Sequence, residues 1–229
     1  MFTAKRSIVQ RAWFLPACTL FGVVCWIATA TSQSISRSGD PGSTSSFTLT
    51  GEIPAHSALR ATAEYAPSGS AQHCNYPPAT LHHHAPRGDS AQPFRFEIAL
   101  SYNLSGCTLL LNDVSLVVDG FYGDAPEQHS ATSGGTIAIR ADMRPRQKNG
   151  VPGFPASGEK EYRGICHWLT LWTAEGQPQA RRLNCEAADK NWKVSSEGQR
   201  QRRPGGAVSR QQLAGKTIRV TLRMAEPPT

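Results

Sequence analysis

The sequence predicts an all-β protein, an antiparallel β-sandwich of about eight or nine strands joined by long connections rich in proline and glycine. Three observations support this. Apolar and polar residues alternate with a period of two, which places one face of a strand on a core and the other in water. Clusters of Gly, Pro and Ser separate the alternating runs. No window combines a sustained helical apolar pattern with helix caps.

The alternating runs define the expected strands. The clearest one starts at Phe94, where apolar residues flank Arg95 and Glu97. Asn112 and Asp113 interrupt another run, as a break or a bulge would. In chain order, the expected strands cover residues 47–53, 59–65, 94–102, 109–118, 137–139, 162–173, 183–187 and 218–224.

Three long segments between these runs are expected to be irregular connections. They cover residues 66–93, 144–159 and 193–216, and each contains proline and glycine or clustered charge. Connections longer than about 12–15 residues in a compact domain are usually functional or disordered. Binding is therefore expected on these segments.

The N-terminal segment is typical of an export signal. Lys5, Arg6 and Arg11 precede an almost uncharged apolar run over residues 12–30, which ends in small residues. Cleavage after Ala30, retention as a membrane anchor, and acylation of Cys18 or Cys25 all remain open. In each case residues 31–46 form a flexible linker, and residues 47–229 form a single β-sandwich domain that faces the periplasm.

The cysteines indicate disulfides rather than a metal or redox site. Cys74, Cys107, Cys166 and Cys185 lie beyond the export segment, and no C-x-x-C pair occurs. Four cysteines allow three pairings. A hairpin with its tip near residues 175–178 places Cys166 opposite Cys185, which leaves Cys74 for Cys107 and ties a long connection to the start of a strand.

The positive charge is modest and dispersed. The formal net charge is +7, and three of these charges lie in residues 1–30, so the remainder carries a surplus of four. Nucleic acid is not an expected partner, because its binders concentrate basic residues with aromatic stacking groups. The densest basic stretch, residues 199–206, holds Arg200, Arg202 and Arg203 beside a proline and two glycines. It is expected to be a solvated loop, or else a contact for an anionic partner, with little effect of its charges on stability.

A histidine cluster raises the question of metal binding. His73, His82, His83 and His84 fall in the connection 66–93. Imidazole is the commonest metal ligand, but three consecutive histidines cannot all face one ion. A solvated histidine-rich loop is the favoured interpretation, and no cofactor is expected.

Aromatic residues mark the strand over 162–173. Tyr162, Trp168 and Trp172 share one face, and Leu169 and Leu171 lie on the other. A strand that is apolar on both faces is usually central in a sandwich, so core packing is favoured over a platform for stacking sugars or peptides.

Motifs for catalysis are missing from the sequence. It has no G-x-S-x-G, no H-E-x-x-H and no S-x-x-K accompanied by its partner motifs. A hydrolase could still use scattered residues such as Asp119, Asp124 or His129, so a scattered active site stays an alternative, as does a metal- or glycan-binding module.

The C-terminal half carries a family resemblance. The segment Pro152-Gly-Phe-Pro-Ala-Ser-Gly-Glu-Lys-Glu-Tyr-Arg-Gly-Ile-Cys-His-Trp168, with Leu183-Asn-Cys185 and residues 213–222, resembles small exported Gram-negative envelope proteins, often lipoproteins. Some of these are immunity partners of secreted toxins. The resemblance implies an immunity-type role. A disulfide-tied scaffold with long irregular loops suits recognition more than chemistry, so the expected function is a non-catalytic, periplasm-facing module that binds another envelope protein, with the membrane contacted only through the N-terminal segment.

Overall fold

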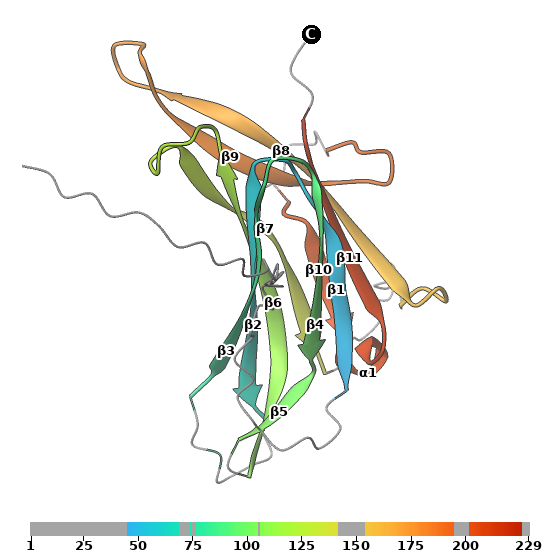
Figure 1. Ribbon diagram of the computed structural model, residues 1–229. Coiled ribbons are helices and arrows are strands. Elements are labelled where there is room, and N and C mark those ends of the chain that lie inside the picture. The colour runs from blue at the N-terminus through green and yellow to red at the C-terminus, as the bar shows by residue number, and fades with distance from the viewer. Residues whose placement is uncertain are drawn as a thin grey trace, which may run out of the picture. The chain divides into compact units, whose positions relative to one another are not determined.

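A computed structural model describes residues 45–68, 74, 77–104, 106–141, 154–194 and 202–225. The export segment, most of the linker, His73 and Arg200 lie outside these residues. The described part belongs to one compact unit and contains eleven strands and one four-residue helix, which confirms the all-β prediction (Figure 1). Within these residues, no helix is long and apolar enough to cross a bilayer.

The strands form two sheets. The first has the order β4 (Gln92–Ala99), β1 (Ser46–Ile53), β11 (Thr217–Met224), β8 (Glu159–Trp172) and β9 (Pro178–Ala188). The second has the order β10 (Gly205–Ser209), β7 (His129–Arg140), β6 (Cys107–Phe121), β2 (Ser57–Pro67) and β3 (Ala79–Gly88), and β5 (Ser101–Leu104) pairs with β6. Helix α1 (Arg210–Leu213) connects β10 to β11.

Both sheets are mixed, which corrects the purely antiparallel prediction. β11 runs parallel to both of its neighbours, β1 and β8, and β10 runs parallel to β7. The other pairs are antiparallel. Alternation in the sequence specifies which side chains face the core, but it carries no information about strand direction.

One hydrophobic core is shared by the two sheets. In β11, Ile218, Val220 and Leu222 are buried, and the residues between them are not. They join side chains of the second sheet such as Leu116 and Ile137 in a single cluster. Burial of these apolar faces is the main driving force for the sandwich.

Two strands occupy segments that were expected to be connections. β3 contains the three histidines, and only Ala85 of its residues is buried. As an edge strand it needs little apolar sequence and tolerates Pro86. β10 begins with Gly205 at φ +119°, where a Cβ would collide with the carbonyl group of Thr136. Glycine therefore allows the close approach of β10 to β7.

The expected irregularity near Asn112 is a β-bulge. Glu64 pairs with Asp113 and Tyr65 with Leu111, so Asn112 is the additional residue in β6. The bulge keeps Leu111 and Val114 on the buried face although they are three residues apart.

Both predicted disulfides are present. Cys166 pairs with Cys185 and Trp168 with Leu183, in the register that the sequence predicted. The second disulfide joins Cys74 to Cys107 at the start of β6, with a Cα–Cα distance of 5.5 Å. Disulfides persist in oxidising compartments, so both bonds are consistent with a location outside the cytoplasm.

Candidate functional site

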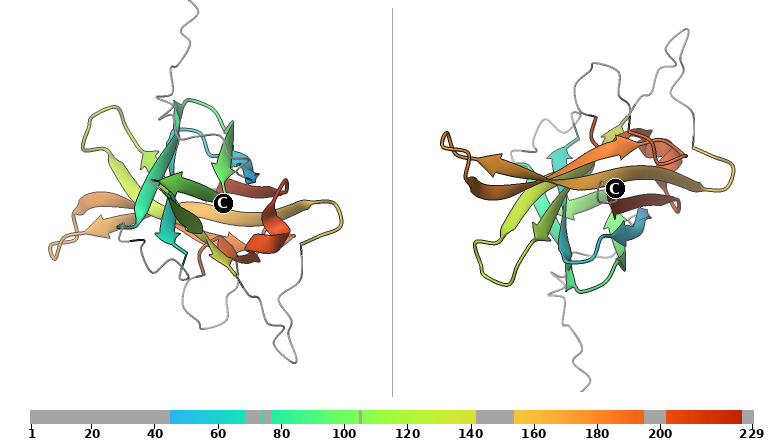
Figure 2. Two further views of the ribbon diagram at one scale, coloured as in Figure 1. Left: turned by 90° about the horizontal axis from the view of Figure 1, so that it is seen from below. Right: turned by 90° about the horizontal axis from the view of Figure 1, so that it is seen from above.

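The β8–β9 hairpin extends beyond the sheet to which it belongs. Pairing of β11 with β8 ends at Met224 and Cys166, but β8 continues with β9 to Trp172 and Pro178. We call the two-stranded extension, residues 167–184, the arm. Figures 1 and 2 show it projecting past the other strands of its sheet.

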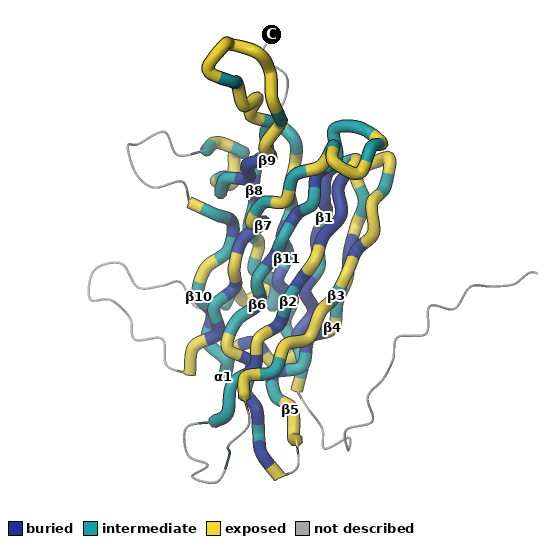
Figure 3. The backbone as a smooth tube through the Cα atoms, turned by 90° about the vertical axis from the view of Figure 1, so that its left-hand side faces the viewer, coloured by how far each residue is buried: buried dark blue, intermediate teal, exposed yellow. Residues whose placement is uncertain are grey.

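The arm exposes large apolar side chains. Leu169, Leu171 and Trp172 are 42%, 44% and 62% exposed, and Figure 3 shows the hairpin tip mostly in the colour of exposed residues. The prediction of core packing on both faces was therefore wrong for these residues, whereas Trp168 packs against the core. The sequence did contain one relevant signal, since the run over 162–173 is much longer than its neighbour over 218–224.

Contacts with β6, β7 and their connection support one face of the arm. Trp168 meets the ring of Tyr122 edge-on, with centroids 5.4 Å apart, and the Arg181 guanidinium lies 5.8 Å from the centre of the same ring. The backbone N–H of Leu183 donates to Ser130 Oγ at 3.2 Å. An open hollow of about 470 Å³ lies beside these contacts and includes Trp172 in its lining.

The base of the arm is fixed by covalent and polar contacts. The Cys166–Cys185 disulfide crosses the hairpin there. Asn184, the residue before Cys185, is 3% exposed and accepts a hydrogen bond from Arg203 Nη1 at 2.7 Å. Its Nδ2 lies 3.4 Å from His167 Nε2. The arm therefore extends from an anchored base.

The structure separates the arginines that the sequence grouped as a contact surface. Arg202 is exposed, but Arg203 is half-buried and donates to both Asn184 Oδ1 and the Cys185 carbonyl oxygen. Arg203 is therefore not a fully solvated loop residue as expected, because its guanidinium connects the segment before β10 to β9. Arg200 lies outside the described residues.

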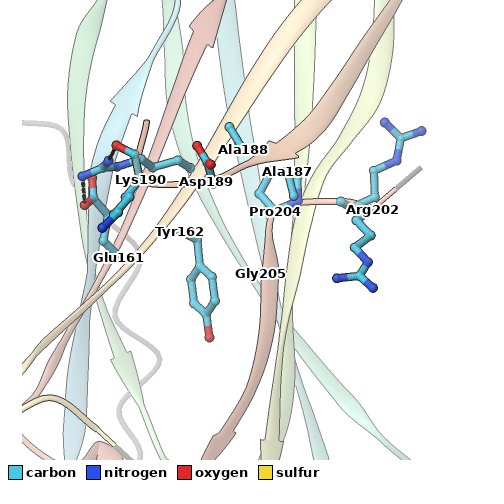
Figure 4. Close-up of a pocket in the computed structure, with 11 residues that line it drawn as sticks. Glu161, Tyr162, Ala187, Ala188, Asp189, Lys190, Arg202, Pro204 and Gly205 are labelled. Atoms are coloured by element: carbon cyan, nitrogen blue, oxygen red, sulfur yellow. Dashed lines mark hydrogen bonds and ion pairs between the residues drawn. The ribbon is translucent and has the colours of Figure 1, made fainter. Parts of the chain in front are cut away.

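Arg202 lines a second hollow, of about 370 Å³, near the end of β9. Figure 4 shows Glu161 and Lys190 on one side of it and Arg202 on the other. Arg163 and Glu161 form an ion pair at 2.6 Å, and the hydrogen bond from this guanidinium lowers the pKa of the Glu161 carboxyl. Burial raises the pKa of Tyr162, which also lines the hollow, to about 12.

A tight turn beside this hollow presents Trp192. Asp189 Oδ1 accepts hydrogen bonds from the backbone N–H groups of Asn191 at 2.8 Å and Lys193 at 2.9 Å. The latter bond is the main reason why the pKa of Asp189 is lowered. Trp192 itself has φ +61°, and the guanidinium of Arg223 lies 4.0 Å from the centre of its ring.

The three consecutive histidines do not converge. His82 Nδ1 lies 3.2 Å from Thr62 Oγ1, whereas the His83 ring packs beside Phe96 on the opposite face of β3. Burial lowers the pKa of His83. His84 is exposed, and no three metal-ligating side chains gather anywhere in the described parts of the chain.

The residues that a scattered active site would need lie in separate contacts. Asp119 accepts from Arg60 at 3.0 Å, and Asp124 pairs with Arg87 at 3.3 Å. His129 Nδ1 lies 2.5 Å from the Pro126 carbonyl oxygen. The arrangement brings no base, acid and nucleophile together among these candidates.

The chain matches no protein family model, no curated protein and no solved structure.

Proposed function

We propose that this protein is an exported, periplasm-facing, non-catalytic module that binds another protein of the envelope. The observation that carries the proposal is the arm, which exposes Leu169, Leu171 and Trp172 on a hairpin tied at its base by a disulfide. An isolated two-stranded hairpin is marginally stable in water, and clustered exposed apolar groups mark interaction sites. A partner that covers this surface would remove it from water.

The narrower form of the proposal is an immunity-type inhibitor of a secreted toxin. It draws on the resemblance of residues 152–168 to exported envelope proteins and on the rigid base of the arm. A preorganised surface loses little conformational entropy on binding, which suits a tight inhibitor. Export is supported by the basic and apolar N-terminal sequence and by the two disulfides.

The test is capture of partners from envelope extract by wild-type protein and by the double variant Leu169→Ser, Leu171→Ser. The control is Leu81→Ser, which changes an apolar residue that is 36% exposed on β3, away from the arm. We expect the double variant to lose a protein that wild type and control retain. Equal capture by all three, with unchanged thermal unfolding, would contradict the proposal.

Glycan binding is the second candidate, favoured by the hollow beside the arm. Trp172 and Tyr122 line it together with Glu127 and Arg181, a mixture of aromatic and planar polar groups that suits a sugar. Under this alternative, the Trp172→Ala variant is not retained on an immobilised envelope glycan, whereas the Leu169→Ser, Leu171→Ser variant is retained as wild type is. Hydrolysis of a peptide, lipid or glycan by purified protein would instead establish an enzyme.

A further inference from the structure

One edge of β8 is left open along the arm. β11 occupies this edge as far as Cys166, where the N–H of Ala225 donates to the Cys166 carbonyl oxygen at 2.7 Å. Beyond Cys166, β8 pairs only with β9 in the described part of the chain. The arm therefore has β9 on one side and no described strand on the other.

The direction of the Cys166 carbonyl identifies the groups that face the open edge. Backbone N–H and C=O groups alternate between the two edges of a strand. Because the backbone groups of Cys166 point toward β11, the N–H and C=O groups of Trp168 and Thr170 point toward the same edge. These groups form a short row of donors and acceptors that an extended chain could pair with.

The chain's own C-terminal sequence is unsuited to continue this ladder. In the register of β11 and β8, the donor that follows Ala225 N–H would be the backbone nitrogen of residue 227, opposite the Trp168 carbonyl. Residues 227 and 228 are both proline, which has no N–H. The sequence after β11 therefore lacks the N–H groups that this ladder would need beside the arm.

Side chains of the arm and of the neighbouring end of β11 indicate the chemistry of an added strand. Leu169 and Leu171 are exposed on one face of β8, and Trp172 is exposed on the other. Three arginines, Arg181 and Arg182 on β9 and Arg223 near the end of β11, are exposed, and Glu175 is the one carboxylate in residues 167–184. An extended segment with alternating apolar and acidic residues complements this surface.

We propose that the open edge of β8 receives such a segment from a protein partner by strand addition, with the Trp168 and Thr170 backbone groups forming the new ladder. This inference rests on the proposed function of the arm as a partner surface. It adds that backbone pairing, and not apolar contact alone, holds the partner, and that the bound part of the partner is extended and acidic.

Thr170→Pro tests the ladder. Proline removes the one N–H at residue 170, which faces the open edge and is not needed for pairing with β9. The matched control, Thr170→Val, keeps the N–H and the β-branched shape. The probe is a fluorescent eight-residue peptide of alternating Asp and Val, and the readout is fluorescence anisotropy.

We expect Thr170→Pro to weaken peptide binding at least tenfold and Thr170→Val to change it less than threefold. Equal binding by wild type and Thr170→Pro would overturn strand addition. The fully N-methylated peptide gives an independent test on unaltered protein, because it has no backbone N–H to donate to the Trp168 and Thr170 carbonyl oxygens. Its binding with undiminished affinity would also overturn the inference, even if Thr170→Pro failed to fold.

Further outcomes separate this inference from the proposed function. If Thr170→Pro captures the envelope partner as wild type does and Leu169→Ser, Leu171→Ser does not, the arm is a partner surface and strand addition is wrong. Tighter binding of a Lys–Val peptide than of the Asp–Val peptide would overturn the acidic assignment. If the wild-type protein forms a dimer and Thr170→Pro abolishes this dimer, the open edge binds a second copy of the chain. That result would overturn the proposal of a different protein as partner.

Discussion

Replacing Arg203 by alanine should destabilise the protein, whereas the same change at Arg202 should not. Arg203 Nη1 donates to Asn184 Oδ1 at 2.7 Å and to the Cys185 carbonyl oxygen at 2.5 Å. Hydrogen bonds from a charged donor contribute about 1.5–3 kcal/mol each, and a buried acceptor that loses its donor keeps its desolvation cost. Asn184 is 3% exposed, so water cannot readily replace the guanidinium.

The magnitude follows from these two contacts. Because Arg203 is itself half-buried, solvent reduces the benefit of each bond, and we expect a total loss of about 2–3 kcal/mol. Arg202→Ala should change the free energy of unfolding by less than about 0.5 kcal/mol, since its side chain is exposed. The main-chain contact of Arg202, from the Ala187 N–H to its carbonyl oxygen at 2.7 Å, is unaffected by the substitution.

Urea unfolding followed by circular dichroism measures both variants. With a slope of about 2 kcal/mol per molar urea, Arg203→Ala should lower the midpoint by about 1–1.5 M and leave the slope unchanged. Coincident midpoints for the two variants would show that the Arg203 contacts do not hold the segment before β10 on β9.

Three further predictions concern stability. Replacing Cys166 and Cys185 by alanine should cost about 3 kcal/mol, because the bond spans a sequence separation of 19, and calorimetry that finds an unchanged melting temperature would contradict this. Burial raises the pKa of Tyr162 to about 12, above the ordinary value near 10, so its contribution to stability is complete below pH 10 and is lost as the pH rises toward 12. The free energy of unfolding of Tyr162→Phe should therefore fall less between pH 10 and pH 12 than that of wild type. Denaturant unfolding at each pH measures this, and identical profiles for the two proteins would show that Tyr162 ionisation is not the cause. Gly205→Ala should destabilise more than Gly176→Ala, since both glycines have positive φ but only the former approaches a neighbouring strand closely, and equal melting temperatures would argue against that packing.

Much of the fold could be predicted from period-two alternation. The runs at 47–53 and 218–224 agree closely with β1 and β11, because each has one face on the core and one in water. The Cys166–Cys185 register followed from hairpin geometry alone. Local sequence is informative where a strand's neighbours lie nearby in the chain.

The missed features depend on distant contacts. β3 is an edge strand with a single buried residue, so its sequence contains little alternation. β10 is held by the close approach of Gly205 to β7, and glycine and proline otherwise indicate a turn. The surroundings of Leu169, Leu171 and Arg203 could not be predicted for the same reason. Leu169 and Leu171 are exposed because β11 ends beside Cys166, and the local sequence does not show where β11 ends. Arg203 is half-buried because Asn184, from another strand, lies beside it.

Site-specific photo-cross-linking in intact cells is the sharpest test of whether the arm is the partner surface. A photoreactive amino acid replaces Leu171 in one protein and Leu81 in another, two exposed leucines on different sheets. We expect a covalent adduct with an envelope protein from position 171 and none from position 81. Adducts from position 81 alone, or the same adducts from both positions, would contradict it.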